Sequence, residues 1–349
     1  MLFHKCSGIW CRLALIAKAT LVLAYSLLAG GDNRAEAAEN AKGVYLLGSV
    51  TSMAGFVPPP GTYGTSYKFF YSGSASGGAA EGVALNDLGK IDQQADIDVD
   101  AQIFIDILTP MWVSENTIFG GNLALGALIP IGWQDVSADV NALTTLTLPG
   151  GRTVQRGGRI SVGDDTFNFG DPVAMAMLGW HRGNWHWKVA GLLNVPIGDY
   201  DKNSIANMGF NRWAVDTHAA ATWLDATKGR EASVNAGFTF NGENDDTNYE
   251  TGTEFHVEFA LMQHLSKAFA IGLAGYHYNQ VTGDSGAGAT LGSFKGRITA
   301  LGPNINYNFQ WGQTPVSTSL RWLHEFDAKN RLEGDAAFFT ATIPLGRAN

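Results

Sequence analysis

Ile97–Ile107 reads Ile-Asp-Val-Asp-Ala-Gln-Ile-Phe-Ile-Asp-Ile, and this stretch decides the fold class. Every odd position is apolar, and every even position except Phe104 is polar. Because side chains alternate between the two faces of a strand, a period of two separates an apolar face from a face with three aspartates and a glutamine. An apolar face for lipid and a polar face for a watery interior are typical of a transmembrane β-barrel.

Similar segments recur along the chain, with turn residues between them. Gly183-Asn184, for example, is a hairpin signal between two apolar runs. The predicted strands are 65–72, 94–113, 117–133, 171–181, 185–197, 213–225, 230–241, 253–265, 267–280, 294–309, 316–327 and 334–345, with one or two more in 134–168. Residues 72–94 are rich in glycine, alanine and serine and predict a loop. We therefore expect an all-β, transmembrane antiparallel β-barrel of about 12 strands.

The composition fits the same fold class. Only 16% of the residues are charged and 43 are glycine, which suits a barrel better than a charged soluble surface. No stretch after the N-terminal region is long and apolar enough for a spanning helix. The formal net charge of −9 argues against nucleic acid and anionic lipid as partners.

The first 37 residues predict a cleaved export signal. A charged start is followed by the mostly apolar stretch 13–29 and by Ala35-Glu36-Ala37, which fits a small-x-small cleavage site. A membrane anchor is the alternative for this apolar stretch. With a signal at 1–37, we expect a Pro/Gly-rich extension at 38–64 and the barrel at 65–349. The expected location is the Gram-negative outer membrane.

The positions of the two cysteines exclude several kinds of site. Cys6 and Cys11 both lie in the predicted signal, so the mature chain would hold no cysteine. Disulfides, thiolate metal sites and a cysteine nucleophile are then excluded.

The proline-rich part of the extension cannot be a central strand. Pro58, Pro59 and Pro60 lack the N–H group that a β ladder needs. We expect this segment at the mouth of the barrel or inside its lumen, where it would act as a plug; a disordered leader is the alternative.

Polar and charged residues on the predicted strands are candidates for the lumen wall, because charge on the lipid face costs several kcal/mol near the midplane. The candidates for the substrate path are Asp98, Asp100, Gln102, Asp106, His186, Lys188, His256, Glu258, Arg297, Arg321 and Glu325, and Glu231 and Asn235 share their pattern. These side chains could line a path for solutes, or pair with one another and hold the lumen shut.

Catalytic and metal-binding patterns are weak. Gly283-Asp284-Ser285-Gly286 is similar to a serine-protease nucleophile segment, but only His277 is nearby and the glycines suit a turn. The histidines have no zinc-binding spacing. We therefore expect neither an enzyme nor a cofactor nor a metal site.

Several blocks of the chain resemble a known family of outer-membrane barrels, which is named for the meta-pathway of phenol degradation. The resemblance rests on 276–289 (YHYNQVTGDSGAGA), 291–297 (LGSFKGR), 301–303 (LGP), 322–327 (WLHEFD) and 330–334 (NRLEG), and on 55–61 (GFVPPPG), 163–164, 170–172, 241–244 and 247–252. It implies an outer-membrane barrel, and some members are associated with the catabolism of aromatic or other hydrophobic compounds. It implies no catalytic residues.

The sequence and this resemblance favour a channel for the passive uptake of small hydrophobic, including aromatic, compounds. The expected partners are outer-membrane lipid and lipopolysaccharide, the hydrophobic substrate, and the barrel-assembly machinery. A structural or adhesive barrel without transport is the alternative. A membrane-embedded lipid hydrolase built on Ser285 and His277 is a further one.

Overall fold

The computed structural model describes residues 43–84, 90–147, 152–289 and 293–346. The predicted export signal at 1–37 lies outside these residues. In the described part of the chain, no helix is long and apolar enough to cross a bilayer.

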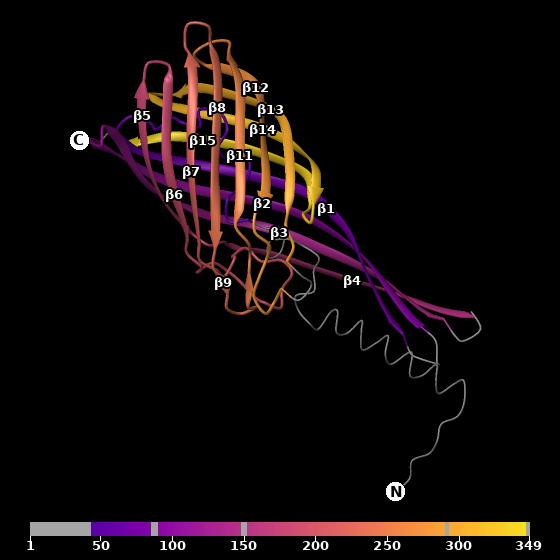
Figure 1. Ribbon diagram of the computed structural model, residues 1–349. Helices are drawn as coiled ribbons and strands as arrows, with labels where there is room; N and C mark the ends of the chain where they lie inside the picture. Colours follow the sequence, from indigo (N-terminus) through magenta and orange to yellow (C-terminus); the bar gives the residue numbers. More distant parts are fainter. Residues whose placement is uncertain (1–42, 85–89, 148–151, 290–292, 347–349) are drawn as a thin grey trace. The chain divides into compact units, whose positions relative to one another are not determined.

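Twelve of the described strands form a closed antiparallel barrel, as the alternation predicts (Figure 1). Around the ring their order is β2-β1-β15-β14-β13-β12-β11-β8-β7-β6-β5-β3, and the pairing of β3 with β2 closes it. The barrel strands are β1 (Gly61–Ala84), β2 (Lys90–Ile118), β3 (Gly121–Thr147), β5 (Val173–Arg182), β6 (Trp185–Asn194), β7 (Ala214–Asp225), β8 (Arg230–Asn241), β11 (Glu254–His264), β12 (Phe269–Gln280), β13 (Arg297–Trp311), β14 (Thr314–Lys329) and β15 (Glu333–Gly346).

The remaining strands lie outside this ring. Strand β4 (Thr153–Phe169) pairs with β3, and β9 (Glu243–Asn244) pairs with β10 (Tyr249–Glu250) in the connection between β8 and β11.

The barrel is apolar outside and polar inside. Along β7 and β8, Asp216 and Asn235 are fully buried, whereas Val215 and Phe240 are 41% and 51% exposed. The outward side chains on the neighbouring strands include Leu261, Leu273, Leu301, Leu320, Trp322 and Phe339. This arrangement is the reverse of a soluble sheet and suits a wall that faces lipid.

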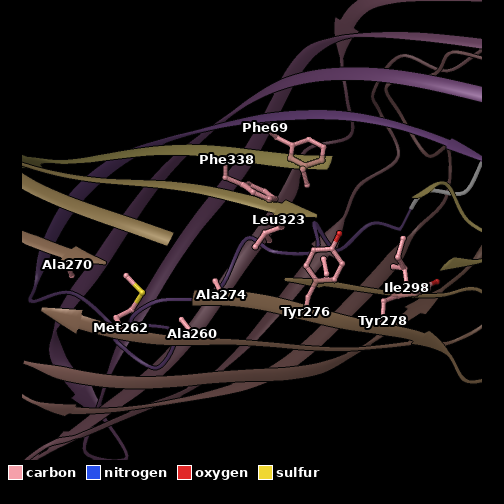
Figure 2. Close-up of a cluster of buried hydrophobic side chains, with 12 residues drawn as sticks. Phe69, Ala260, Met262, Ala270, Ala274, Tyr276, Tyr278, Ile298, Leu323 and Phe338 are labelled. Atoms are coloured by element: carbon pink, nitrogen blue, oxygen red, sulfur yellow. The ribbon is translucent and has the colours of Figure 1, made fainter. Parts of the chain in front are cut away.

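One part of the inner wall is apolar instead. Phe69, Phe338, Leu323 and Ile298 gather in a buried cluster, together with Tyr276, Tyr278, Met262 and small alanines (Figure 2). They come from strands β1 and β11–β15. We call this set the inner apolar wall.

The two ends of the barrel differ in their connections. At one end the strands join through tight turns, and Gly183 and Gly312 adopt positive φ there (59° and 61°), which costs glycine little. At the other end lie the longer connections 195–213, 242–253 and 281–296. Bacterial barrels place short turns at one side of the membrane and long loops at the other.

The chain divides into two compact units, and the described part of the larger one is built from 43–75, 99–137, 163–289 and 293–346. The described part of the smaller unit is built from 76–84, 90–98, 138–147 and 152–162. Its polar contacts include Ser76 to Asp98, and Arg159 and Ser161 to Asp139.

The predicted loop at 72–94 and the predicted end of the 117–133 strand are wrong, whereas β4 is one of the one or two further strands expected in 134–168. The predicted loop at 72–94 is mostly strand, because β1 runs to Ala84 and β2 begins at Lys90. In 134–168, β3 continues to Thr147 and then returns as β4. A long hairpin satisfies its backbone polar groups through the ladder, so small side chains with low β-propensity are tolerated there.

The cost of a charge on the outer face should follow its depth in the bilayer. Phe259→Arg, in the middle of β11, should destabilise the folded barrel by about 2–4 kcal/mol, and Leu265→Arg, beside a tight turn, by about 0–1 kcal/mol. Equilibrium unfolding from lipid vesicles measures both. Equal costs at the two positions would contradict the lipid-facing assignment of β11.

Candidate functional site: a lumen that contains the N-terminal segment

Residues 43–60, which precede β1, lie inside the barrel. Gly43 is placed beside Glu254, at the end of β11 near the long loops. Val57 accepts a hydrogen bond from the His181 ring at its carbonyl (3.1 Å), near the tight turn between β5 and β6. The segment therefore runs along the lumen from one end to the other. We call it the lumen segment.

Glu258 of β11 holds the middle of the lumen segment. Its carboxylate accepts hydrogen bonds from the amides of Gly48 (2.5 Å) and Val50 (2.8 Å), and from the Tyr45 hydroxyl (3.1 Å). Glu258 is fully buried. Hydrogen bonds to an ionised acceptor are stronger than neutral ones, so this side chain is a main anchor of the segment.

A second carboxylate holds the segment closer to the tight-turn end. Glu231 of β8 accepts from the amide of Met53 (2.6 Å) and from the Ser52 hydroxyl (3.0 Å). Ser233 (2.7 Å) and the ring of His264 (2.8 Å) also contact this carboxylate. Two wall carboxylates thus satisfy backbone amides that have no ladder partner.

A buried cluster around Asp216 supports Tyr45. The Asp216 carboxylate contacts the rings of His218 (2.7 Å) and His256 (2.8 Å) and accepts from the Thr239 hydroxyl (2.7 Å). The Tyr45 ring stacks on His256, with 3.6 Å between the centroids and 12° between the planes. The cluster fixes the imidazole face on which the segment rests.

Arg321 of β14 contacts the segment from another side of the ring. Its Nη1 donates to the Thr51 hydroxyl (2.7 Å) and to the Ser49 carbonyl (3.3 Å). The guanidinium lies over the Phe338 ring, 5.0 Å from its centroid. Arg321 therefore connects the lumen segment to the inner apolar wall.

The inner apolar wall is itself covered by the segment. Leu46 and Leu47 pack against the cluster that contains Phe69, Phe338 and Leu323. The inner apolar wall is therefore in contact with the lumen segment at these two residues.

The buried part of the segment ends before the three prolines. Val57 is buried with Val113 and Ala124, whereas Pro58 is half-buried and Pro59 and Pro60 are exposed. The prolines thus follow the packed region, and Tyr45–Val57 makes most of the contacts with the wall.

Six of the predicted lumen residues do point inward. They are His186, Lys188, His256, Glu258, Arg321 and Glu325. Glu325 accepts hydrogen bonds from Tyr71 (2.8 Å) and from Tyr276, so it joins the inner wall. Lys188 is buried on β6.

The structure corrects the predicted orientation of the β2 residues, because the predicted lumen positions face outward. Ile103 and Ile105 pack on the inner apolar wall, so the odd positions of β2 face inward. Asp106 bonds to Ser66 and Lys68, which alternate along β1 with the inward Phe69, and Asp100 and Gln102 are exposed. Asp98, in the smaller unit, is exposed and bonds to Ser76.

Arg297 also differs from the expectation. Ile298 and Ala300 of β13 are buried in the inner wall, so Arg297 lies on the opposite face, where it forms an exposed ion pair with Asp327 (2.8 Å). Alternation separates the two faces of a strand, but it does not say which face is inside. Because the inner wall is apolar beside β2, the polar face of this strand was wrongly assigned to the lumen.

Asp216 and Tyr45 were missed by the sequence reasoning. Asp216 lies two residues before His218 on β7, so their shared face was a usable signal. Tyr45 lies in the segment before the strands, where no periodicity indicates a contact.

The proposed serine–histidine pair does not come together. The Ser285 hydroxyl donates to Glu250 (3.3 Å), and the His277 ring contacts Thr299 (2.9 Å). His277 alternates with the buried Tyr276 and Tyr278 and so faces away from the lumen. Among the described residues, no group of three or more His, Cys, Asp or Glu side chains could hold a metal ion.

A family model and one solved structure agree with this architecture. Residues 80–341 match the model of a family described as "Putative MetA-pathway of phenol degradation". An outer membrane channel of the COG4313 group from Pseudomonas putida F1 superposes with a TM-score of 0.60 at 16% identity, over 86% of this chain and 99% of that chain. A Pseudomonas aeruginosa FadL homologue gives a TM-score of 0.37 at 13% identity, over 90% and 97%. No curated protein matches in sequence.

Removing the charge of Glu258 should loosen the lumen segment. Glu258→Gln keeps the shape but loses the charge-assisted bonds to Gly48 and Val50, worth about 1.5–3 kcal/mol each. Hydrogen exchange of residues 46–52 should accelerate by about tenfold or more. Glu333→Gln, which removes an acceptor at an exposed turn, is the matched control and should leave this exchange unchanged.

Gly55 is placed where no side chain fits. A Cβ there would lie 2.3 Å from the His186 carbonyl oxygen and 2.7 Å from the Thr222 amide nitrogen. Gly55→Ala should therefore destabilise the protein by about 1–3 kcal/mol in a urea titration, because backbone must move. Gly158→Ala, which meets open space, should cost much less. Equal stability of Gly55→Ala and the parent would show that the segment packs loosely.

Proposed function

The chain belongs to the MetA-pathway of phenol degradation family, and from this premise we propose that it is a passive outer-membrane channel for small hydrophobic, including aromatic, compounds, with the lumen segment as its plug. The observation that carries the proposal is the contact of Leu46 and Leu47 with the inner apolar wall. Binding sites for apolar solutes are lined mainly by hydrophobic and aromatic side chains. When the segment moves, this wall becomes available to such a solute.

The geometry also suggests how the plug could move. Its anchors are hydrogen bonds to Glu231, Glu258 and Arg321, and a few such bonds can exchange for water without disturbing the barrel strands. No energy-coupling device is needed, since a solute would run down its concentration gradient. The Pseudomonas putida protein with a similar fold is an outer membrane channel, which agrees with this proposal.

The cellular setting belongs to the same proposal. The chain would be exported through a signal cleaved near residue 37 and inserted into the Gram-negative outer membrane by the barrel-assembly machinery. The end with tight turns would face the periplasm, and outward aromatics such as Trp185 and Trp213, at opposite ends of neighbouring strands, would lie near the lipid and lipopolysaccharide headgroups.

A structural barrel without a path is the second candidate. The observation in its favour is that the described lumen segment fills the space beside Glu231, Glu258 and Arg321. A plug that never leaves would make the barrel impermeable.

Removal of the plug distinguishes the two candidates. In a strain that lacks the chromosomal copy, the parent protein should restore uptake of a labelled alkylbenzene or fatty acid, and deletion of 43–60 should increase that uptake. A variant with alanine at positions 58–60 is the matched control, because it keeps Tyr45–Val57, and its uptake should equal that of the parent. Equal entry of alkylbenzene, fatty acid and sugar with and without the protein would favour the structural role.

A further inference from the structure

One peptide group of the lumen segment is contacted on both of its polar sides by the barrel wall. The peptide group that joins Ser49 to Val50 accepts a hydrogen bond from Arg321 Nη1 at its carbonyl oxygen (3.3 Å), and its N–H donates to Glu258 (2.8 Å). Glu258 lies on β11 and Arg321 on β14, and β12 and β13 separate these strands in the ring. Two wall side chains therefore bind a single secondary amide.

Glu258 is the acceptor in this arrangement. Its Oε1 accepts from the amide of Gly48, and its Oε2 accepts from the amide of Val50 and from the Tyr45 hydroxyl. A backbone N–H group can only donate, so both carboxyl oxygens act as acceptors. Within the described residues, every hydrogen bond of this buried side chain comes from the lumen segment.

Arg321 is the donor, and it also depends on the lumen segment. Its shortest hydrogen bond goes to the Thr51 hydroxyl (2.7 Å), whereas its contact with Thr340 of the wall is long (3.5 Å). The side chain is 4% exposed, and its Nε has no hydrogen-bond partner among the described residues. Without the segment, this guanidinium would lack its best acceptors, and unpaired buried donors are costly.

The inner apolar wall lies directly beside the bound peptide group. A Cβ on Gly48 would lie 2.8 Å from Leu323 Cδ1 and 3.1 Å from Phe338 Cε2, so the backbone just before this peptide group touches both side chains. The Arg321 guanidinium lies 5.0 Å from the centroid of the Phe338 ring. A molecule that replaced the segment would thus meet an apolar surface next to one donor and one acceptor.

These two side chains distinguish solutes by their polar groups. A secondary amide offers an oxygen to Arg321 and an N–H group to Glu258. An ester or a tertiary amide offers only the oxygen, which leaves the buried carboxyl group unpaired. A carboxylate has no proton to donate to Glu258, and an ammonium group has no acceptor for Arg321. A hydrocarbon satisfies neither side chain.

We propose that Glu258 and Arg321 form an amide-binding subsite of the lumen, which the peptide group between Ser49 and Val50 occupies in this structure. When this part of the segment withdraws, the secondary amide of an apolar solute takes its place, with the hydrocarbon part on the inner apolar wall. The ligand class is apolar secondary amides, such as anilides and N-benzyl amides. The withdrawal step rests on the proposed function.

The test is binding to the full-length protein with a loosened segment. Glu231→Gln weakens the separate anchor at Ser52 and Met53 and leaves Glu258 and Arg321 in place. Calorimetric titration of this protein compares N-benzylacetamide with benzyl acetate and N-benzyl-N-methylacetamide, which share its ring and carbonyl group. The secondary amide should bind at least about tenfold more tightly than the other two, because it alone donates to Glu258. Its binding should also accelerate hydrogen exchange of residues 48–51, since ligand and segment compete.

Further substitutions in the Glu231→Gln protein separate the roles of the two side chains. Glu258→Met removes the acceptor, and the secondary amide should then bind no more tightly than the ester. Arg321→Met removes the donor and should weaken the amide and the ester by the same factor, about tenfold. Arg297→Met, which removes an exposed arginine of β13, is the matched control and should change neither affinity.

Several results would overturn the amide subsite. Equal binding of the secondary amide and the ester to the Glu231→Gln protein is one, and amide binding that leaves the exchange of 48–51 unchanged is another, because the ligand would then lie elsewhere. If Glu258→Met does not fold by circular dichroism, Glu258→Gln replaces it and should reduce the preference for the secondary amide. An unchanged preference would remove Glu258 from the subsite.

The subsite and the proposed channel can fail separately. A preference for the secondary amide without any effect of the protein on cellular uptake would contradict the channel, while the amide subsite would stand. Uptake of the alkylbenzene through the protein, with equal binding of the amide and the ester, would support the channel and overturn the subsite.

Discussion

The closed ring of backbone hydrogen bonds is the constraint on which everything else in this molecule depends. A bilayer offers no water to an unpaired N–H or C=O group, so a spanning sheet must have no open edge. Here the pairings of β1 with β15 and of β2 with β3 remove both edges of the barrel sheet. Once the ring is closed, each strand has one face toward lipid and one toward the lumen, and every later feature follows from that division.

Inside the closed ring, the lumen segment has backbone amides that no β ladder can satisfy. Side chains of the barrel wall accept hydrogen bonds from these amides. Carboxylates from β8 and β11 take the place of strand partners for Met53, Gly48 and Val50. This arrangement explains how Glu231 and Glu258 can be buried in the lumen, because each carboxylate accepts hydrogen bonds from several donors. The lumen segment is thus held to the barrel by side chains rather than by a sheet.

The barrel was predictable from the sequence because two periodic signals, alternation and turn residues, repeat in nearly every strand. The assignment of faces was less predictable. On β8 and β11 the polar face is the buried one, and Glu231, His256 and Glu258 could be assigned to the lumen correctly. On β2 the same rule failed, because part of the lumen is apolar and Ile103 and Ile105 belong there. The strands that line the inner apolar wall are determined by contacts across the ring. The sequence of a single strand does not indicate these contacts. The contacts of Tyr45 depend on the path of an irregular segment, which periodicity does not describe.

The lumen segment and β1 are parts of one continuous chain. The lumen segment leads directly into Gly61, the first residue of a barrel strand. A plug that leaves the lumen is therefore still tethered at the mouth, and its return is an intramolecular event with an effective concentration in the millimolar range. In the proposed channel, each opening would therefore be brief and would end without a partner protein, and the resting permeability would depend on the length of this tether as well as on the strength of the contacts inside.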